Sequence, residues 1–472
     1  MRTLSAVKCS FALALVSLFL CAVSSAQDAV LSGTVVTPDK VIASGWVVVK
    51  NGRIVAIRES APDDARGPRV ETNGIIFPGF VDLHDHPMYN IFERWTPKTK
   101  FRNRYEWRDL VEYNEMVGRP GGELQKKVDE DHTFCDMDEF VELKALIGGT
   151  TSITGISPRG GFAAPVPKCV AGLARNLDWA SGFDGADFGH GRVENVLGVT
   201  TRDLKGPALQ AIRIDLEEHK IDLLLIHVAE GAPGDMESAA EFRALKGVGL
   251  LGPNTAVIHG VALGADEFQE MAKNGTALIW SPRSNFELYG FTADVAAAVK
   301  ANVTVALAPD WSPTGSTNSL AELKYAKQIS HERLSDLFTD EVLFQMSTSI
   351  PAKVAHVEEK VGSLKAGMYA DLFILNGDRS RPYAALAAAK PQDVQLVLVG
   401  GVPMYGSEGL MNAFQAKTES VDICGAKMYL NVAALPAGPY STVVARLGDD
   451  LKPYAGNRPL PPQLGKLVEC GQ

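Results

Sequence analysis

The 472-residue sequence predicts an α/β fold: a (β/α)8 TIM barrel with a small β-sandwich domain formed by the segments that flank it. Three observations predict this. Apolar runs of strand length alternate with helical stretches between residues 139 and 308. Short β-like runs with turn signals lie on both sides of that region. Histidine or aspartate directly follows several of the apolar runs, where barrels carry their reactive groups.

The composition indicates a globular protein with small-molecule partners. The chain is 46% hydrophobic and 22% charged, and its formal net charge is −10. An acidic chain offers no basic surface for nucleic acid, so nucleic-acid partners are not expected. Past the first residues no apolar run reaches the roughly 18 residues of a membrane span. A homo-oligomer is left open.

Residues 1–26 read as a secretory signal, with Arg2 and Lys8, an apolar stretch and a small-residue end. We therefore expect an exported protein, periplasmic or extracellular. Removing the segment changes the net charge from −10 to −12.

Residues 27–78 are predicted as the first part of the sandwich. Apolar runs at 31–36, 45–50 and 53–57 read as strands, and Asn51-Gly52 between the last two is the strongest short hairpin signal. Residues 362–410, again β-like, are predicted as the second part.

The barrel is predicted over residues 79–361, beginning with the run at 77–87 that ends in a His-x-His pair. The period of two in a strand would place His84 and His86 on one face and Asp85 on the other. Two imidazoles so placed can bind one metal ion, although two hydrogen-bonded histidines at a strand end would look the same.

The polar and aromatic residues 88–138 form an insertion after this strand. Its length favours a lid or pocket wall, with a solvated surface excursion as the alternative. Its large and basic side chains are Arg94, Trp95, Arg102, Arg104, Tyr105, Trp107, Arg108 and Tyr113.

Seven more strands complete the predicted barrel, with helices expected between several of them. The strands are predicted at 150–155, 170–173, 193–199, 221–227, 255–259, 276–280 and 303–308. The helices are predicted at 139–147, 207–219, 265–274 and 292–301. The remaining residues, 411–472, read as an irregular arm.

The strand ends carry the candidate site. His227 ends the fifth strand and Asp310 follows the eighth, so with His84 and His86 they offer one ion three imidazoles and a carboxylate. Each of these residues alone has an ordinary structural explanation, but their joint placement favours a metal centre. Two acid–base groups, Glu230 and His259, stand at neighbouring strand ends.

Six stretches together resemble the amidohydrolase superfamily, and are most similar to its branch of cytosine and guanine deaminases and triazine hydrolases. The resemblance implies one zinc, or iron, held by His84, His86, His227 and Asp310, with Glu230, His259 and Asp310 catalytic. No lysine ends the fourth strand to bridge a second metal, and Lys205 lies beyond it. The stretches are Pro-Gly-Phe-Val-Asp-Leu-His-Asp-His, His-Val-Ala-Glu, the His259 strand, Ser-Pro-Arg-Ser-Asn-Phe-Glu-Leu, the Asp310 strand and Val-Gly-Ser-Leu-Lys-Ala-Gly-Met-Tyr-Ala-Asp-Leu.

The expected activity is hydrolysis of a carbon–nitrogen bond, other than a peptide bond, in a small molecule by activated water. Asp310 would act as the base, His259 would stabilise developing charge and Glu230 would carry a proton to the leaving group. Arg283 and Asn285 are candidates for substrate binding, although Arg283 could equally be a solvated surface charge. A lactone or ester hydrolase and an inactive exported binding protein are the alternatives.

Four of the six cysteines remain after the signal. In an oxidising compartment an even number favours disulfides. We expect Cys424–Cys470, which would close a loop within the arm, and Cys135–Cys169, with four free thiols as the alternative.

Overall fold

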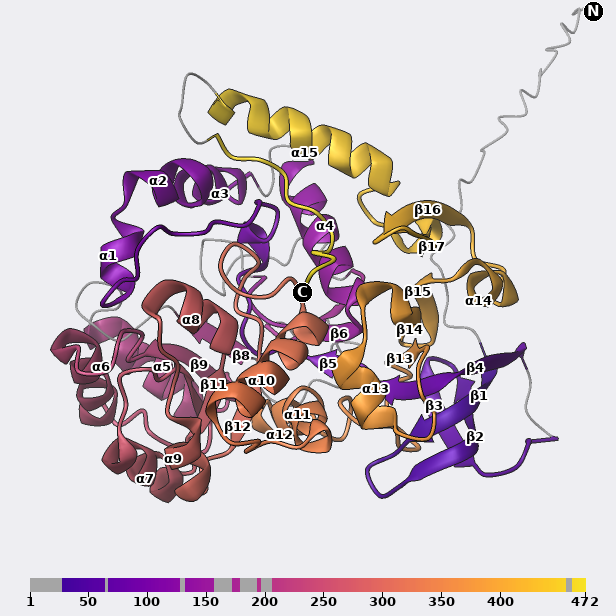
Figure 1. Ribbon diagram of the computed structural model, residues 1–472, viewed down its shortest axis with the longest axis horizontal. Coiled ribbons are helices and arrows are strands. Elements are labelled where there is room, and N and C mark those ends of the chain that lie inside the picture. Colours follow the sequence, from indigo (N-terminus) through magenta and orange to yellow (C-terminus); the bar gives the residue numbers. More distant parts are fainter. Residues whose placement is uncertain are drawn as a thin grey trace, which may run out of the picture.

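The computed structural model describes residues 28–63, 67–127, 132–156, 172–178, 193–196, 206–455 and 461–472. Within them, the chain builds one large mixed sheet beside a region of parallel strands and surrounding helices (Figure 1). The predicted signal lies outside the described residues. None of the helices in the described part of the chain has the length and apolar character needed to span a membrane.

The large sheet joins the two segments that flank the predicted barrel. Its nine strands run in the order β16-β17-β15-β14-β13-β4-β1-β2-β3. The junction is the antiparallel pairing of β4 with β13, which lie on opposite sides of the barrel in sequence. The hydrogen bonds thus form one sheet, and a sandwich of two sheets stays a prediction, as do the domain boundaries. The strands are β1 Ala29–Val36, β2 Val41–Lys50, β3 Arg53–Arg58, β4 Arg69–Pro78, β13 Leu372–Leu375, β14 Val394–Val399, β15 Val402–Gly406, β16 Thr418–Ile423 and β17 Ala426–Asn431.

The hairpin predicted at Asn51-Gly52 is confirmed. It connects β2 to β3, which pair in antiparallel register. Asn51 and Gly52 have φ values of 50° and 76°. Positive φ at both central residues gives a turn whose twist matches that of the flanking strands, which explains the Asn-Gly sequence.

Eight further strands are paired in parallel, in two sheets. One sheet has the order β5-β6-β7 and the other the order β12-β11-β10-β9-β8. A parallel bridge between Asp85 and Asp310 connects the segments that follow β5 and β12. The strands are β5 Phe80–Val81, β6 Thr150–Ile153, β7 Arg175–Asn176, β8 Val193–Val196, β9 Leu223–Val228, β10 Thr255–His259, β11 Ala277–Trp280 and β12 Val305–Leu307.

Seven of the eight predicted barrel strands coincide with these elements, and the third does not. Of the predicted range 170–173 only Gly172 and Leu173 are described, and neither is in a strand. The strand β7 begins at Arg175, where a polar pair replaces the expected apolar run. Residues 197–199 of the fourth predicted strand lie outside the described residues.

The helices cover the parallel strands, as the alternating pattern predicts. The first predicted helix begins earlier than expected, at Thr133, and nearly all of its side chains are buried. The helices around the strands are α4 Thr133–Ile147, α5 Gly206–Glu217, α6 Met236–Gly247, α7 Ala265–Asn274, α8 Pro282–Tyr289, α9 Val295–Lys300, α10 Ser319–Arg333, α11 Asp340–Met346, α12 Ser349–Val354 and α13 Pro382–Ala388.

The insertion forms short helices that lie over one end of the parallel strands. They are α1 Arg104–Arg108, α2 Val111–Tyr113 and α3 Arg119–Leu124, preceded by a 3-10 turn at Pro87–Tyr89. Trp95 and Trp107 are buried in the main core cluster. The insertion is therefore packed structure rather than a solvated excursion.

The prediction of an irregular arm at residues 411–472 is wrong for much of that segment. It contains α14 Glu408–Ala413 at its start, the hairpin β16–β17, and α15 Tyr440–Ala455, which packs on α4 (Figure 1). Val443, Leu447 and Leu451 recur every four residues and are the buried face of α15. The predicted Cys424–Cys470 disulfide is confirmed, with 5.5 Å between the Cα atoms. The predicted partner of Cys135 is Cys169, which lies outside the described residues, so that pair stays a prediction.

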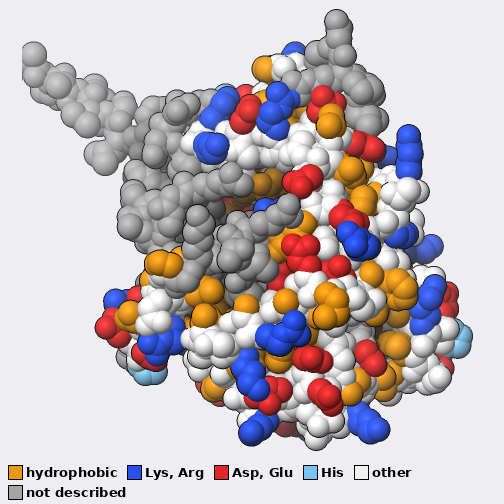
Figure 2. Space-filling view, turned by 90° about the vertical axis from the view of Figure 1, so that its left-hand side faces the viewer, with side chains coloured by type: hydrophobic (Ala, Val, Ile, Leu, Met, Phe, Trp, Pro, Cys, Tyr) orange, Lys and Arg blue, Asp and Glu red, His pale blue; other side chains and the backbone are white. Residues whose placement is uncertain are grey.

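Charged side chains of both signs are interspersed over the described part of the face in Figure 2. This described surface therefore shows no extended basic patch of the kind that binds nucleic acid.

Candidate metal centre

The His-x-His pair lies just beyond β5, which ends at Val81. Although the strand stops before them, both rings turn to one centre, and their centroids are 5.4 Å apart. Asp85 turns away, and its Oδ1 accepts a hydrogen bond from Asn90 Nδ2 at 2.8 Å. The alternation expected of a strand is therefore retained in the segment that continues it.

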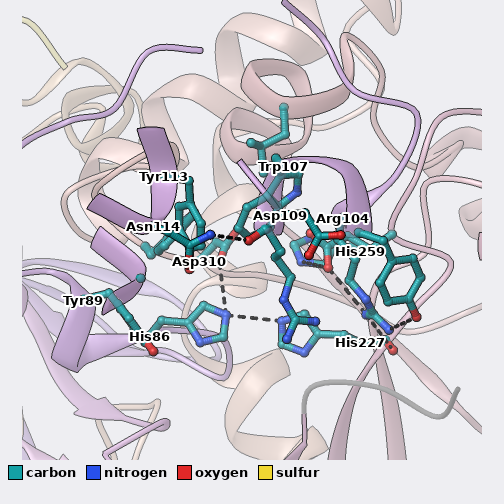
Figure 3. Close-up of a pocket in the computed structure, with 16 residues that line it drawn as sticks. His86, Tyr89, Arg104, Trp107, Asp109, Tyr113, Asn114, His227, His259 and Asp310 are labelled. Atoms are coloured by element: carbon teal, nitrogen blue, oxygen red, sulfur yellow. Dashed lines mark hydrogen bonds and ion pairs between the residues drawn. The ribbon is translucent and has the colours of Figure 1, made fainter. Parts of the chain in front are cut away.

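Four potential ligand atoms converge from three strand ends, and Figure 3 shows three of the residues that carry them, His86, His227 and Asp310. His227 Nε2 lies 3.2 Å from His84 Nε2 and 3.3 Å from His86 Nε2. Asp310 Oδ1 lies 3.3 Å from His84 Nε2 and 3.5 Å from His86 Nε2. Ligands about 2.0 to 2.1 Å from a tetrahedral ion are about 3.3 Å from one another. These four separations are those expected between neighbouring ligands of one metal ion.

Backbone hydrogen bonds hold two of the ligand segments together. Asp310 N donates to His84 O at 2.9 Å, and His86 N donates to Asp310 O at 2.8 Å. Gly155 packs against this pair with φ of 96°, and a Cβ atom there would lie 2.3 Å from Asp85 O. A residue with a side chain would therefore displace the loop that carries His84 and His86.

Burial sets the protonation of the ligands. Loss of hydration lowers the pKa of His84 well below its usual value and lowers that of His86 to about 4, which favours neutral imidazoles with a free lone pair. The same burial raises the pKa of Asp310 well above its usual range. A buried carboxylate among neutral imidazoles lacks a cation, and a divalent ion would supply it. The residues present therefore fit a metal.

Hydrogen bonds from outside the cluster orient the ligands. Ser281 Oγ lies 2.8 Å from His84 Nδ1, which leaves Nε2 facing the centre. Ser281 is fully buried and immediately follows β11. Sequence inspection did not single it out, because serine after a strand is common.

The two predicted acid–base groups lie beside the cluster. His259 Nε2 is 3.7 Å from Glu230 Oε2, and both side chains are buried. His259 and Asp310 both have positive φ, 69° and 70°. Left-handed backbone at a residue other than glycine costs about 1 to 3 kcal/mol, so the fold holds both side chains in strained positions at strand ends.

Asn285 and Arg283, the two candidates for substrate binding, lie on α8, and their contacts differ from that prediction. Asn285 Nδ2 lies 2.8 Å from His259 Nδ1 and so orients that ring. Arg283 Nε donates to Ser316 Oγ at 2.7 Å, and its guanidinium lies over the Tyr325 ring. Among the described residues neither lines the pocket, so the prediction of direct substrate contact finds no support.

A pocket of about 420 Å³ opens onto the cluster. The insertion supplies much of its wall, which agrees with the pocket-wall interpretation of that segment. Three aromatic rings pack together there: Trp107 lies 5.6 Å from Trp311 and 5.0 Å from Tyr113 between centroids. The pocket is lined by His86, Tyr89, Arg104, Tyr105, Trp107, Arg108, Asp109, Tyr113, Asn114, Gly118, His227, Glu230, His259, Leu288, Asp310 and Trp311.

The structure thus combines an α/β fold with a candidate metal centre at its strand ends. Comparison with known proteins is more specific. The model of the amidohydrolase family matches residues 218–404. A 5-methylthioadenosine/S-adenosylhomocysteine deaminase of Thermococcus onnurineus is 24% identical, over 75% of this chain and 88% of the relative.

Two solved structures share the fold. An adenosine deaminase from Xanthomonas campestris with bound zinc superposes with a TM-score of 0.67 and 17% identity, covering 91% of this chain and 98% of that one. A triazine hydrolase from Arthrobacter aurescens superposes with a TM-score of 0.65 and 16% identity, covering 90% of this chain and 99% of that one. The matched family model and these relatives support the resemblance to the amidohydrolase superfamily that the motifs indicated.

Proposed function

We propose that this protein is a metal-dependent hydrolase of carbon–nitrogen bonds in small molecules, of the deaminase type. The observation that carries the proposal is the convergence of His84, His86, His227 and Asp310, with 3.2 to 3.5 Å between neighbouring ligand atoms, beside a pocket that Glu230 and His259 also line. Three nitrogens and one carboxylate oxygen favour one zinc, with iron as the alternative.

The protein's own groups can perform the acid–base steps. When bound, a divalent metal supplies Lewis-acid activation of water. Asp310 and Glu230 are the carboxylates that can accept protons from the attacking water. Glu230 then passes a proton to the leaving nitrogen, and His259, oriented by Asn285, stabilises the charge that develops on the substrate.

The names of the relatives support displacement of an amino group. Several are deaminases of 5-methylthioadenosine and S-adenosylhomocysteine, and one is a 5'-deoxyadenosine deaminase. The pocket volume suits a ligand of small-molecule size. We take amino-substituted heterocycles as the first substrates to test.

Two further parts of the proposal concern the whole chain. The eight parallel strands close into a (β/α)8 barrel, which the Asp85–Asp310 bridge and the fold of the neighbours support. Residues 1–26 direct export, and N-terminal sequencing of the secreted protein should find them removed.

The test is a substrate panel with metal-loaded protein: amino-substituted purines and pyrimidines, N-acyl amino acids and lactones. Release of ammonia from the first group is expected. Turnover of lactones alone would replace the proposal with an esterase activity, and no turnover at all would favour a binding protein. On any true substrate Glu230→Gln should keep the metal and lose about 10²- to 10⁴-fold in kcat, because an amide cannot carry a proton.

A further inference from the structure

Glu230 is held in a buried hydrogen-bond network that the acid–base steps do not use. Tyr289, the last residue of α8, donates from its hydroxyl to Glu230 Oε1 at 2.6 Å. Tyr289 is 2% exposed and Glu230 is 4% exposed, so water does not compete freely for this bond. Glu230 Oε1 therefore has a fixed donor.

Trp107 sets the direction of that bond. Its indole Nε1 donates to the Tyr289 hydroxyl at 2.8 Å. An indole N–H can only donate, so the Tyr289 oxygen must accept, and its single proton is left for Glu230. A proton on Glu230 Oε1 would clash with the Tyr289 hydroxyl proton, because both would lie between the same two oxygens. Rotation of the Tyr289 hydroxyl would relieve the clash, but it would turn the proton toward the indole N–H of Trp107.

The other oxygen of Glu230 has looser neighbours. Oε2 lies 3.7 Å from His259 Nε2 and 3.6 Å from the Arg104 guanidinium. Both separations are longer than a hydrogen bond, so Oε2 can take up a proton without breaking an existing hydrogen bond. Glu230 also lines the pocket.

Arg104 comes from the insertion and is anchored beside Glu230. Its Nη2 lies 2.9 Å from Glu241 Oε1, which also accepts from the Tyr105 hydroxyl at 2.8 Å. The backbone of Arg104 donates to Glu230 O at 3.2 Å. Arg104 lies between the carboxylates of Glu230 and Glu241 and is 2% exposed. Its charge therefore interacts strongly with both, because buried charges are poorly screened by water.

We propose that Tyr289 and Arg104 are positioning residues that confine the proton carried by Glu230 to its Oε2 atom. The inference rests on the proposed function. Glu230 starts ionised, accepts one proton from water on Oε2, passes that proton to a nitrogen of the substrate and ends ionised, so no other reactant is required. Tyr289 is not among the residues that line the pocket, and Arg104 is held there by its ion pair with Glu241. The insertion thus completes the acid–base machinery as well as the pocket wall.

The main experiment removes the Tyr289 hydroxyl alone. Tyr289→Phe should lower kcat by about 10- to 100-fold, the range expected for losing a hydrogen bond to a charged group. KM should stay within about twofold and metal content should match wild type, whereas Tm should fall, because the two buried hydrogen bonds of the Tyr289 hydroxyl are lost. Tyr405→Phe is the matched control, since it removes a buried hydroxyl in the distant strand β15 and should leave all four quantities unchanged.

A double-mutant cycle separates positioning from a general structural effect. In a Glu230→Gln background, Tyr289→Phe should cost less than about twofold of the residual turnover, because Tyr289 acts through Glu230. An undiminished loss in that background would overturn the inference. For Arg104, the Arg104→Gln variant should lose kcat and Arg104→Lys should recover part of it; full kcat in Arg104→Gln would refute its role.

The outcomes distinguish the two proposals. If Glu230→Gln is inactive while Tyr289→Phe keeps wild-type kcat, the positioning inference fails and the proposed function stands. If the wild type hydrolyses no compound of the panel, the proposed function fails. If Glu230→Gln keeps full activity on a true substrate, the proton-shuttle role of Glu230 fails and the inference fails with it. Should Tyr289→Phe not fold, the Arg104 pair carries the test.

Discussion

At the scale of single residues, the metal cluster is determined by the ends of strands. His227 is the fifth residue of β9, and Asp310 follows β12 by three residues. Their side chains converge because parallel strands end at the same face. Their chemistry is set by burial, which keeps the imidazoles neutral and leaves the carboxylate in need of a cation.

His227→Ala tests the cluster. His227 Nε2 is the atom within 3.3 Å of both other imidazoles, so its loss opens the site on one side. The variant should retain less than about a tenth of the wild-type metal after dialysis, measured by elemental analysis. His331→Ala is the control, because His331 is exposed on α10 and pairs only with Asp336 among the contacts described. Full metal retention by His227→Ala would contradict the ligand assignment.

At the scale of elements, α4 carries an unusual load of buried acids. Asp136 pairs with Arg446 of α15, and Glu139 accepts a hydrogen bond from Ala437 N at 2.8 Å. Glu142 Oε2 accepts from Leu173 N at 2.6 Å and Ala174 N at 3.1 Å. The helix thus fixes neighbouring segments through carboxyl groups instead of apolar contacts alone.

Glu142 should make stability depend on pH. Burial raises its pKa to about 8, so the folded protein holds a proton that the unfolded chain releases near pH 4.5. Protonated Glu142 therefore contributes its full share to the free energy of unfolding below about pH 4.5. This share is lost as the pH rises from there to about 8, by at most about 1.4 kcal/mol per pH unit.

The measurement is urea unfolding at pH 5, 6, 7 and 8. Glu142→Gln keeps an oxygen acceptor but cannot ionise, so its free energy of unfolding should fall less with pH than that of wild type. Glu332→Gln, at an exposed position on α10, serves as the control and should follow wild type. Equal slopes for Glu142→Gln and wild type would show that Glu142 does not carry the effect.

The last segment of the chain is a second element with a distinct role. Its disulfide joins the β16–β17 turn to residue 470, and the segment beyond α15 pairs with the loop after His86: Gly465 N donates to Ile91 O at 2.7 Å. The loop's Asn90 in turn contacts both Asp85 and Ser312. The segment after α15 is therefore hydrogen-bonded to the loop that follows His86, and that loop in turn contacts the residues beside His86 and Asp310.

Replacing both cysteines, Cys424→Ser with Cys470→Ser, should lower the free energy of unfolding by about 3 to 4 kcal/mol on the chain-entropy account. Thermal and denaturant unfolding of the variant and of wild type measure this. A reductant should bring wild type at least as low as the variant. An unchanged free energy of unfolding in the variant would show that the disulfide does not stabilise the fold.

At the scale of the whole molecule, metal binding and folding are linked. The candidate ligands lie after β5, within β9 and after β12, far apart in sequence, so a bound ion would link these parallel strands. The part of the fourth strand that is described, Val193–Val196, contains no lysine to bridge a second ion.

We therefore expect about one transition-metal ion per chain, and chelation should lower Tm. Free metal at a hundred times its Kd would stabilise the fold by about 2.7 kcal/mol. Elemental analysis and calorimetry before and after chelation measure both quantities, and His227→Ala should show no rise in Tm when metal is added back. Two tightly bound ions per chain would contradict the single-site assignment.

The sequence alone predicted the candidate ligand set, the order of most strands and the resemblance to the superfamily. These follow from local signals: apolar runs of period two or 3.6, an Asn-Gly turn, and ionisable residues directly after apolar runs. Where the local signal is weak the prediction was wrong, as at β7, whose Arg175–Asn176 is polar, and at α15, whose apolar face was missed among its polar residues.

Only the tertiary structure decided which groups act on Glu230 and where Arg283 points. Arg104 and Glu241 are 137 positions apart, and Tyr289 and Glu230 are 59 apart. No local pattern encodes such pairs, because each depends on how the insertion and α8 pack over the strand ends. Arg283 and Asn285 are two residues apart on one short helix, yet Asn285 orients His259 and Arg283 packs on Tyr325 of α10, because a helix turns neighbouring side chains to different faces.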